Sequence, residues 1–272
     1  MSAFLGITRE RVFSPGRVAD DRAILEAVAA CLRRRGHLVT VFGGDDKRWP
    51  EPTGGTVVFT MSQGEEALAR LQRWAARGVR IVNPPAGILN CQRHRTIVAL
   101  AQAQIPFPES VVVDTREPPV LPAWVGNGSA WIKRGDVHAT EADDVVRIDG
   151  DAAARQALEK LRARGIRRAL VQRHVPGTVL KFYAVRERFF HCVPPGHGQE
   201  IAAPVLHNID TLGAQAARAL NLEVYGGDCV VAMNGRLQLI DLNDWPSYAP
   251  CRAGAAEAIA ANLLAHDVTI GT

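Results

Sequence analysis

Two aspartates and an asparagine near the C-terminal end of the chain are spaced so that they could meet on one face of a β-hairpin. Residues 224–243 read VYGGDCVVAMNGRLQLIDLN, in which an Asn-Gly pair separates two apolar runs. Asn-Gly is the preferred sequence of a two-residue type I′ turn, which fixes the strand pairing on both sides. Counted from that turn, Asp228 lies directly opposite Asp241, and Asn243 shares the face of Asp241 because strand side chains alternate.

Opposed aspartates in an apolar hairpin are unfavourable without a ligand. Directly opposite residues have Cβ atoms roughly 4.5–5.5 Å apart, and like charges placed there are destabilising. A divalent cation offsets the repulsion, and these oxygen ligands suit Mg²⁺, or Mn²⁺ in its place, shared with substrate phosphates. A solvated sheet face with incidental acids is the alternative. Burial is favoured by the flanking apolar residues Val230, Val231, Leu239 and Ile240.

The pattern Asp-x12-Asp-x-Asn, ending in DLNDWPSY, is similar to the metal-binding end of the ATP-grasp superfamily. The resemblance extends over most of the chain, from about residue 80 to about residue 250. It implies an α/β protein with the ATP-grasp fold, made of α+β lobes, that binds ATP. In that superfamily an acid on one strand and an acid-x-Asn group on the next hold the magnesium of ATP. The resemblance therefore implies this role for Asp228, Asp241 and Asn243.

A lysine at the end of an apolar strand is the candidate phosphate ligand. Lys133 stands in AWIKRGDVHA, and a lysine at this place in the superfamily binds the α- and β-phosphates. A solvated charge is the alternative. Two departures leave the covering of the γ-phosphate open: the superfamily often has Lys-Pro where this chain has Lys133-Arg134, and its longer glycine-rich loop is shortened here to RGDVHA.

Residues 170–175, LVQRHV, followed by Pro-Gly, are similar to the hinge that binds adenine. The resemblance implies that Gln172 and the backbone of Arg173 and Val175 meet the base edge, which needs donors and acceptors in fixed register. A plain exit from strand to loop is the alternative. The glutamate with which many members hold the ribose is replaced by Val179, so that contact is missing or comes from elsewhere.

Three more basic residues are candidates for contacts with the nucleotide, the transferred phosphate or the acceptor. Lys181 lies among apolar neighbours in TVLKFYAV and therefore needs an anionic partner. The resemblance implies that Lys181, together with Arg252, contacts the transferred phosphate or the acceptor, and an edge-strand lysine is the alternative. Arg93, in NCQRHRTIVALAQAQIPFP, falls where the first nucleotide-binding lysine often stands. Arginine keeps the charge but changes its geometry.

The elements that position these residues fall into three predicted domains. Residues 1–90 alternate strand and helix, which predicts a small parallel sheet with helices on its faces, a Rossmann-like domain. Residues 91–172 form a central ATP-grasp lobe, and residues 173–272 form a C-terminal lobe with the magnesium hairpin. The predicted strands are 3–7, 37–42, 56–61, 79–83, 110–114, 130–134, 169–172, 178–185 and 189–193, besides the hairpin. The predicted helices are 20–35, 64–77, 90–103, 151–164, 209–220 and 253–265.

Composition limits the partners. The chain has 272 residues and a formal net charge of +4, which is too little to indicate nucleic acid and favours an anionic ligand. Five scattered cysteines without a Cys-x-x-Cys pair predict a reducing, cytoplasmic location. No apolar run approaches the roughly 18 residues of a membrane span, so no membrane partner is expected. The sequence does not determine the oligomeric state.

These features lead to a hypothesis for the reaction. The chain resembles the ribosomal-protein glutamate ligase and glutathione synthetase branch of the superfamily. That implies an ADP-forming ligase that phosphorylates a substrate carboxylate and couples the acyl phosphate to an amine. The acceptor would be an anionic small molecule or a peptide. The Walker A, G-x-G-x-x-G and G-x-S-x-G motifs are absent, which excludes P-loop, dinucleotide-binding and serine-hydrolase functions.

Two alternatives stay open. Inositol polyphosphate kinases of the trisphosphate 5/6-kinase type have the same fold and an aspartate at the position of Asp241, where ligases usually have glutamate. Their Phe-Lys-Val-Tyr-Val-Val segment is similar to LKFYAV here, but no dense basic cluster for a polyphosphorylated ring is present. A nucleotide-binding module without catalysis is the third hypothesis. The opposed aspartates argue against it.

Overall fold

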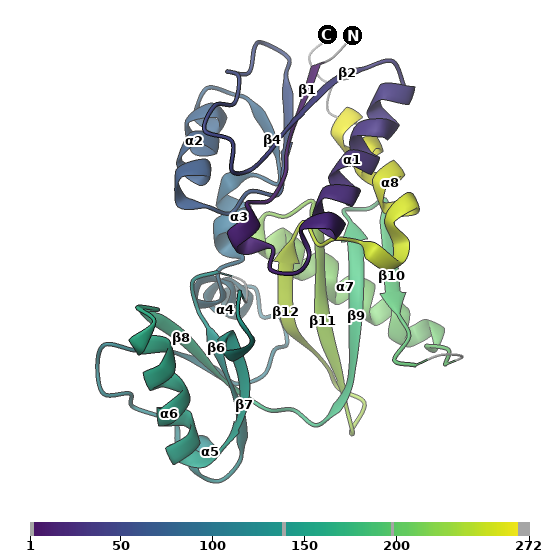
Figure 1. Ribbon diagram of the computed structural model, residues 1–272. Coiled ribbons are helices and arrows are strands. Elements are labelled where there is room, and N and C mark those ends of the chain that lie inside the picture. Colours follow the sequence, from purple (N-terminus) through teal and green to yellow (C-terminus); the bar gives the residue numbers. More distant parts are fainter. Residues whose placement is uncertain (1–2, 138–139, 197–198, 266–272) are drawn as a thin grey trace.

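The computed structural model describes residues 3–137, 140–196 and 199–265 (Figure 1). Within these residues the strands form three four-stranded sheets, one from each successive part of the chain. In Figure 1 the N-terminal sheet lies at the top, the central sheet at the lower left and the C-terminal sheet beside it. None of the described helices is long and apolar enough to cross a membrane.

The N-terminal sheet is parallel throughout, in the order β2-β1-β3-β4, as the alternation of strand and helix predicts. Its strands are β1 (Ala3–Ile7), β2 (Leu38–Phe42), β3 (Val57–Thr60) and β4 (Arg80–Val82). The accompanying helices are α1 (Val18–Arg34), α2 (Glu65–Ala76) and α3 (Pro85–Asn90). Acids in the first turn of α1 and arginines in its last turn complement the helix dipole.

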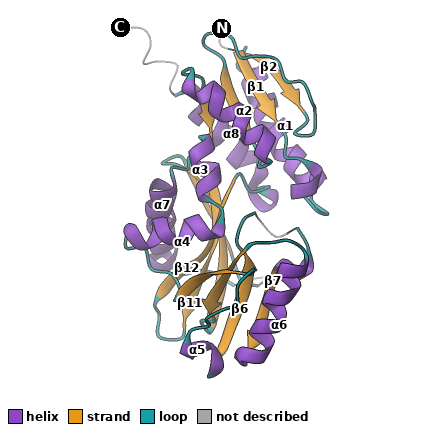
Figure 2. Cartoon of the chain, turned by 90° about the vertical axis from the view of Figure 1, so that its left-hand side faces the viewer, coloured by secondary structure: helices purple, strands orange, loops and turns teal. Residues whose placement is uncertain are grey.

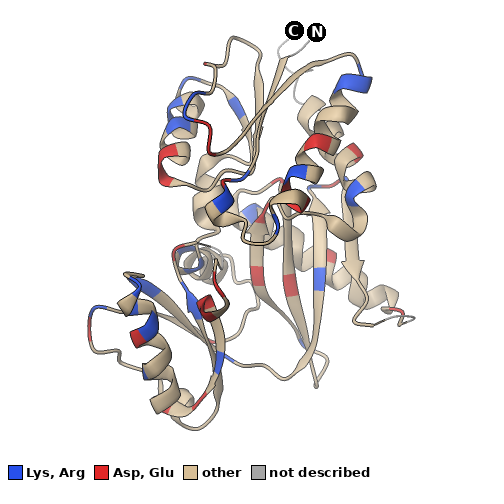
Figure 3. Ribbon diagram, in the orientation of Figure 1, with Lys and Arg blue, Asp and Glu red and all other residues tan. Residues whose placement is uncertain are grey.

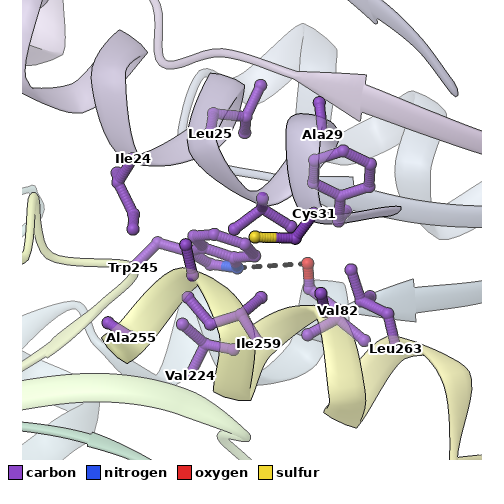
Figure 4. Close-up of a cluster of buried hydrophobic side chains, with 14 of the residues drawn as sticks. Ile24, Leu25, Ala29, Cys31, Val82, Val224, Trp245, Ala255, Ile259 and Leu263 are labelled. Atoms are coloured by element: carbon purple, nitrogen blue, oxygen red, sulfur yellow. Dashed lines mark hydrogen bonds between the residues drawn. The ribbon is translucent and has the colours of Figure 1, made fainter. Parts of the chain in front are cut away.

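The C-terminal helix α8 (Arg252–Leu264) returns to the N-terminal domain and packs against α1. The predicted boundary at residue 173 does not anticipate this contact. Figure 4 shows the shared core, in which the indole of Trp245 is fully buried and donates a hydrogen bond of 3.1 Å to the carbonyl of Val82. The N-terminal sheet is therefore anchored to the C-terminal sheet through a common core.

The central sheet is antiparallel, in the order β5-β8-β6-β7. Its strands are β5 (Ser110–Asp114), β6 (Ser129–Arg134), β7 (Val145–Asp149) and β8 (Arg168–Arg173). The short helix α5 (Ala123–Gly126) and the longer α6 (Gly150–Ala163) pack on it. The sequence analysis did not find β7, because five residues at a sheet edge give little periodic signal.

The C-terminal sheet is also antiparallel, in the order β10-β9-β11-β12. Its strands are β9 (Gly177–Val185), β10 (Phe189–Val193), β11 (Val224–Ala232) and β12 (Leu237–Asp244). Figure 2 shows α4 (Arg93–Gln102) and α7 (Ala203–Leu220) on one side of the lower half and α6 on the other, with the sheets between.

Two helix predictions need correction. The helix expected at 90–103 is α4, which begins at Arg93 after a separate helix, α3, that was not predicted. Helix α7 begins six residues before the expected 209. Leu100 of α4 is buried in the same cluster as residues of α7 and the C-terminal sheet. The element that begins the predicted central lobe therefore packs against the C-terminal lobe.

Candidate active site

The hairpin pairs Asp228 with Asp241, as the sequence predicts, but through a different turn. The Ala232 N–H donates to the Arg236 carbonyl at 2.9 Å, which closes a three-residue loop and not the expected two-residue type I′ turn. Gly235 has φ +77°, a conformation that glycine adopts without steric cost. Alone, this longer loop would shift the pairing by one residue and turn one aspartate to the other face of the sheet.

A β-bulge at Ile240 restores the register. Cys229 pairs with Leu239 and Asp228 pairs with Asp241, so Ile240 is the extra residue on β12. The bulge and the longer turn shift the pairing in opposite directions, and together they give the opposition that a two-residue turn alone would give. The prediction of opposed aspartates is confirmed, and the prediction of the turn is wrong.

A row of charges crosses three neighbouring strands. Lys181 on β9 pairs with Asp228 on β11, which pairs in turn with Asp241 on β12. The Lys181 Nζ lies 2.6 Å from Asp228 Oδ1, so the predicted anionic partner of this lysine is confirmed. Figure 3 shows the acidic and basic segments side by side across these strands. Asn243 lies two residues beyond Asp241, opposite Gly226.

Two further cations reach this row from other elements. Arg93, at the start of α4 and 6% exposed, donates to Asp241 Oδ2 at 2.9 Å and to the carbonyls of Arg134 and Val137. Lys133, at the end of β6 and also 6% exposed, donates to the Ile240 carbonyl at 3.0 Å. Arg93 therefore ties the loop after Lys133 to the acidic hairpin. Residues 138–139 of that loop lie outside the described part of the chain.

A cavity of about 440 Å³ lies between the central and C-terminal sheets. That volume is in the range of small-molecule sites. It brings together seven of the ten predicted site residues: Lys133, Gln172, Arg173, Val175, Lys181, Asp228 and Asp241.

The remaining three predicted residues, Arg93, Asn243 and Arg252, do not line this cavity. Arg93 reaches it only through Asp241. Arg252 lies at the start of α8, where it donates to Asp20 of α1 at 3.1 Å.

No family model and no curated protein matches the chain, whereas solved structures match nearly all of it. A D-alanine–D-alanine ligase from Bacillus anthracis, in complex with ATP, has a TM-score of 0.72 at 10% identity, with 100% of both chains covered. The D-cycloserine synthetase DcsG has a TM-score of 0.71 at 17% identity, with 96% of this chain and 100% of its own covered. An ATP-grasp RimK domain protein from Sphaerobacter thermophilus has a TM-score of 0.68 at 19% identity, with 96% and 99% covered.

The chain has the ATP-grasp fold. The predicted fold class is thereby confirmed, with a parallel N-terminal sheet followed by two antiparallel ones. At 10–19% identity the likeness carries the fold alone.

The segment predicted to bind the base, residues 172–175, uses two of its backbone donors within the protein. Gln172 is 3% exposed and lines the cavity. The Arg173 N–H, however, donates to the Glu109 carbonyl at 2.8 Å, and the His174 N–H donates to the Ser129 carbonyl at 3.0 Å. Since both donors are used within the protein, the N–H of Val175 is the candidate donor to a base.

Sequence reasoning missed one wall of the cavity. Trp131 and His174 both line it, and the Trp131 Nε1–H donates to His174 Nδ1 at 3.1 Å. Trp131 stands two residues before Lys133 on β6, so strand alternation places both on one face. The spacing of Trp131 and Lys133 could therefore have identified Trp131 as a lining residue from the sequence. Val145 also lines the cavity, but it belongs to β7, which the sequence did not reveal.

Burial and neighbouring charges shift the pKa values of two groups that line the cavity. Burial raises the pKa of Asp228, Lys181 lowers it, and the nearby Asp241 raises it further. Burial lowers the pKa of Lys133 to about 8, although Asp241 opposes this shift. The described residues contain no group of three or more His, Cys, Asp and Glu placed to hold a metal. Two carboxylates with oxygens from an amide and from phosphates fit a hard divalent cation such as Mg²⁺.

Proposed function

We propose that this protein is a Mg²⁺- and ATP-dependent ligase that joins a carboxylate to an amine. The observation that supports this most is the row of Lys181, Asp228 and Asp241, which lines one cavity together with Lys133. Such an arrangement of fixed charges suits phosphoryl transfer, in which catalysis depends on positioning and electrostatic stabilisation. The ATP-grasp fold agrees with it, and solved structures that share this fold include enzymes named as ligases or synthetases.

The base and the phosphates are assigned to opposite ends of the cavity. Gln172 and the backbone of Val175 would read the base edge. Lys133 would bind the α- and β-phosphates, because its ammonium group is already desolvated in the folded protein and can form a charge-assisted hydrogen bond with an anion. Lys181 would contact the γ-phosphate or the acceptor.

The metal would be held by Asp228, Asp241 and Asn243. When bound, Mg²⁺ would offset the negative charge of the phosphates. Arg93 is a positioning residue in this proposal, because it contacts Asp241 and the loop after Lys133 and does not line the cavity. Arg252 is left out of the proposed machinery, since its guanidinium is paired with Asp20 away from the cavity lining.

The proposed reaction has two displacements. A carboxylate oxygen of an anionic small molecule or peptide attacks the γ-phosphorus, the bond to the β–γ bridging oxygen breaks, and ADP leaves. The amine nitrogen then attacks the acyl carbon and loses a proton as inorganic phosphate departs with the C–O bond electrons. No protein nucleophile is needed for either step.

Phosphorus NMR of the products tests the proposal. The protein is incubated with ATP, Mg²⁺ and pools of carboxylates, amines and inositol phosphates. ADP and free phosphate that require both a carboxylate and an amine support the ligase. A new phosphomonoester signal would instead establish a kinase. Nucleotide binding without any product would favour a noncatalytic module. The K133M variant, assayed in parallel, controls for contaminating ATPases.

A further inference from the structure

The lysine of the charged row occupies a carboxylate that we assign to the metal. The Lys181 Nζ lies 2.6 Å from Asp228 Oδ1, and the two residues pair across β9 and β11. Both also line the cavity, as does Asp241, so the ion pair borders the space that a ligand would fill. An ammonium group and a divalent cation bind the same carboxylate oxygens. Lys181 and a metal ion at the hairpin therefore compete for Asp228.

The other aspartate is also paired, but with a cation that is fixed in place. Arg93 donates to Asp241 Oδ2 at 2.9 Å and to two carbonyls of the loop that follows β6, and its side chain is 7% exposed. The Lys181 side chain is 49% exposed, and in the described part of the chain its ammonium group has one hydrogen-bond partner, Asp228. Because lysine has a flexible four-carbon stem, Lys181 can leave its carboxylate, whereas Arg93 is held by three acceptors.

The charges at this end of the cavity disfavour a metal ion that arrives alone. Three cationic side chains, Lys133, Lys181 and Arg93, lie next to two carboxylates, Asp228 and Asp241. A dication would add to this positive excess, and it would have to displace the Lys181 ammonium group from its carboxylate. A nucleoside triphosphate brings negative charge that offsets the metal, and its phosphate oxygens offer the displaced ammonium group a new partner.

We propose that Lys181 masks Asp228 from divalent cations until a nucleoside triphosphate binds, and that its ammonium group then moves to the phosphates. Asp228 becomes available to the metal as Lys181 gains a phosphate oxygen in its place. Only hydrogen bonds and metal coordination change in this exchange, and no proton is transferred. By linkage, the nucleotide and the metal raise each other's affinity by the same factor. The inference rests on the proposed function, in which Asp228 is a metal ligand and Lys181 a phosphate ligand.

Titration of the nucleotide-free protein with Mn²⁺, followed by electron paramagnetic resonance at pH 7, tests the masking. K181M should bind Mn²⁺ about tenfold more tightly than the wild type, the effect of one hydrogen bond between charged groups. K181R keeps a cation beside Asp228 and should bind Mn²⁺ as the wild type does. K160M, at an exposed lysine of α6, should also leave the affinity unchanged. No gain in K181M would overturn the masking.

Two further comparisons separate masking from a general effect of charge. D228N and K181M/D228N complete a double-mutant cycle, in which the gain from K181M should be lost once Asp228 is gone. K133M removes a cation that lies in the same cavity but donates to the Ile240 carbonyl and not to a carboxylate. K133M should therefore gain less Mn²⁺ affinity than K181M. An equal gain in K133M, or a K181M gain that persists without Asp228, would overturn the masking.

The same measurement with ATP present distinguishes failure of the masking from failure of the proposed function. If the wild type binds Mn²⁺ with ATP and K181M gains nothing without it, the masking is wrong and the proposed function stands. If Mn²⁺ binds neither the wild type nor K181M, with or without ATP, both are wrong. K181Q replaces K181M if the methionine variant does not fold, since it also removes the charge while keeping a polar side chain.

Discussion

The Lys133 ammonium group donates a hydrogen bond of 3.0 Å to the carbonyl of Ile240, the bulged residue of the acidic hairpin. The bulge thus has two consequences. It sets Asp241 opposite Asp228, and it supplies the carbonyl that accepts the hydrogen bond of Lys133. One irregularity in β12 therefore fixes the position of the acidic row relative to Lys133, the residue that we assign to the phosphates.

Replacing Lys133 by methionine should weaken ATP binding by at least tenfold. The substitution keeps most of the side-chain volume and removes the buried cation that we assign to the α- and β-phosphates. Isothermal titration with Mg²⁺ and ATP measures the effect. K160M, at a lysine exposed on α6, is the matched control and should bind ATP as the wild type does. Equal affinities for wild type and K133M would remove Lys133 from the site.

ATP binding should weaken as the pH rises above 8. Burial lowers the pKa of Lys133 to about 8, so in the free protein its ammonium form is lost above that pH. At pH 9 about one-tenth of the lysine would be protonated, which predicts up to about a tenfold increase in the dissociation constant relative to pH 7. Binding in this range should also take up a proton, since phosphates favour the charged form. Calorimetry in buffers of different ionisation enthalpy detects that proton, and K133M should not take it up.

Replacing Asp241 by asparagine should impair metal binding more than folding. The amide can still accept a hydrogen bond from Arg93, but it lacks the charge that favours a divalent cation. Electron paramagnetic resonance with Mn²⁺ and ATP should show at least a tenfold weaker site. D151N, at an exposed aspartate of α6, serves as the control. If D241N keeps full Mn²⁺ affinity and turnover, the metal assignment is wrong.

Replacing Arg93 by methionine should lower the free energy of unfolding by about 2 kcal/mol. The substitution removes an ion pair with Asp241 and the donor to the carbonyls of Arg134 and Val137, all from a side chain that is 7% exposed. Urea denaturation measures the change, and R95M at the exposed neighbouring arginine should cost less than about 0.5 kcal/mol. If R93M and the wild type have the same free energy of unfolding, these contacts of Arg93 do not contribute to the stability of the fold.

Much of the fold follows from local sequence signals. The alternation of strand and helix before residue 90 determines a parallel sheet, because parallel strands need crossovers that helices supply. The sequence did not predict the edge strand β7, since a five-residue strand is defined by its pairing with β6 more than by its own pattern. The packing of α8 on α1 is also invisible in the sequence, because an alanine-rich helix does not reveal which neighbour covers it.

The sequence by itself determined which residues could do the chemistry. Residue type, strand alternation and an assumed two-residue turn led to the prediction that Asp228 and Asp241 oppose each other, and the hydrophobic flanks indicated burial. For Lys181 the sequence indicated only that it needs an anionic partner. Only the tertiary structure decided how they are held. The turn length and the compensating bulge set the register of the hairpin. Of the four contacts that Arg93 and Lys133 make to the acidic hairpin and the loop beside it, two join residues more than 100 positions apart. Such long-range contacts arise from the packing of whole elements, and local propensity cannot specify them.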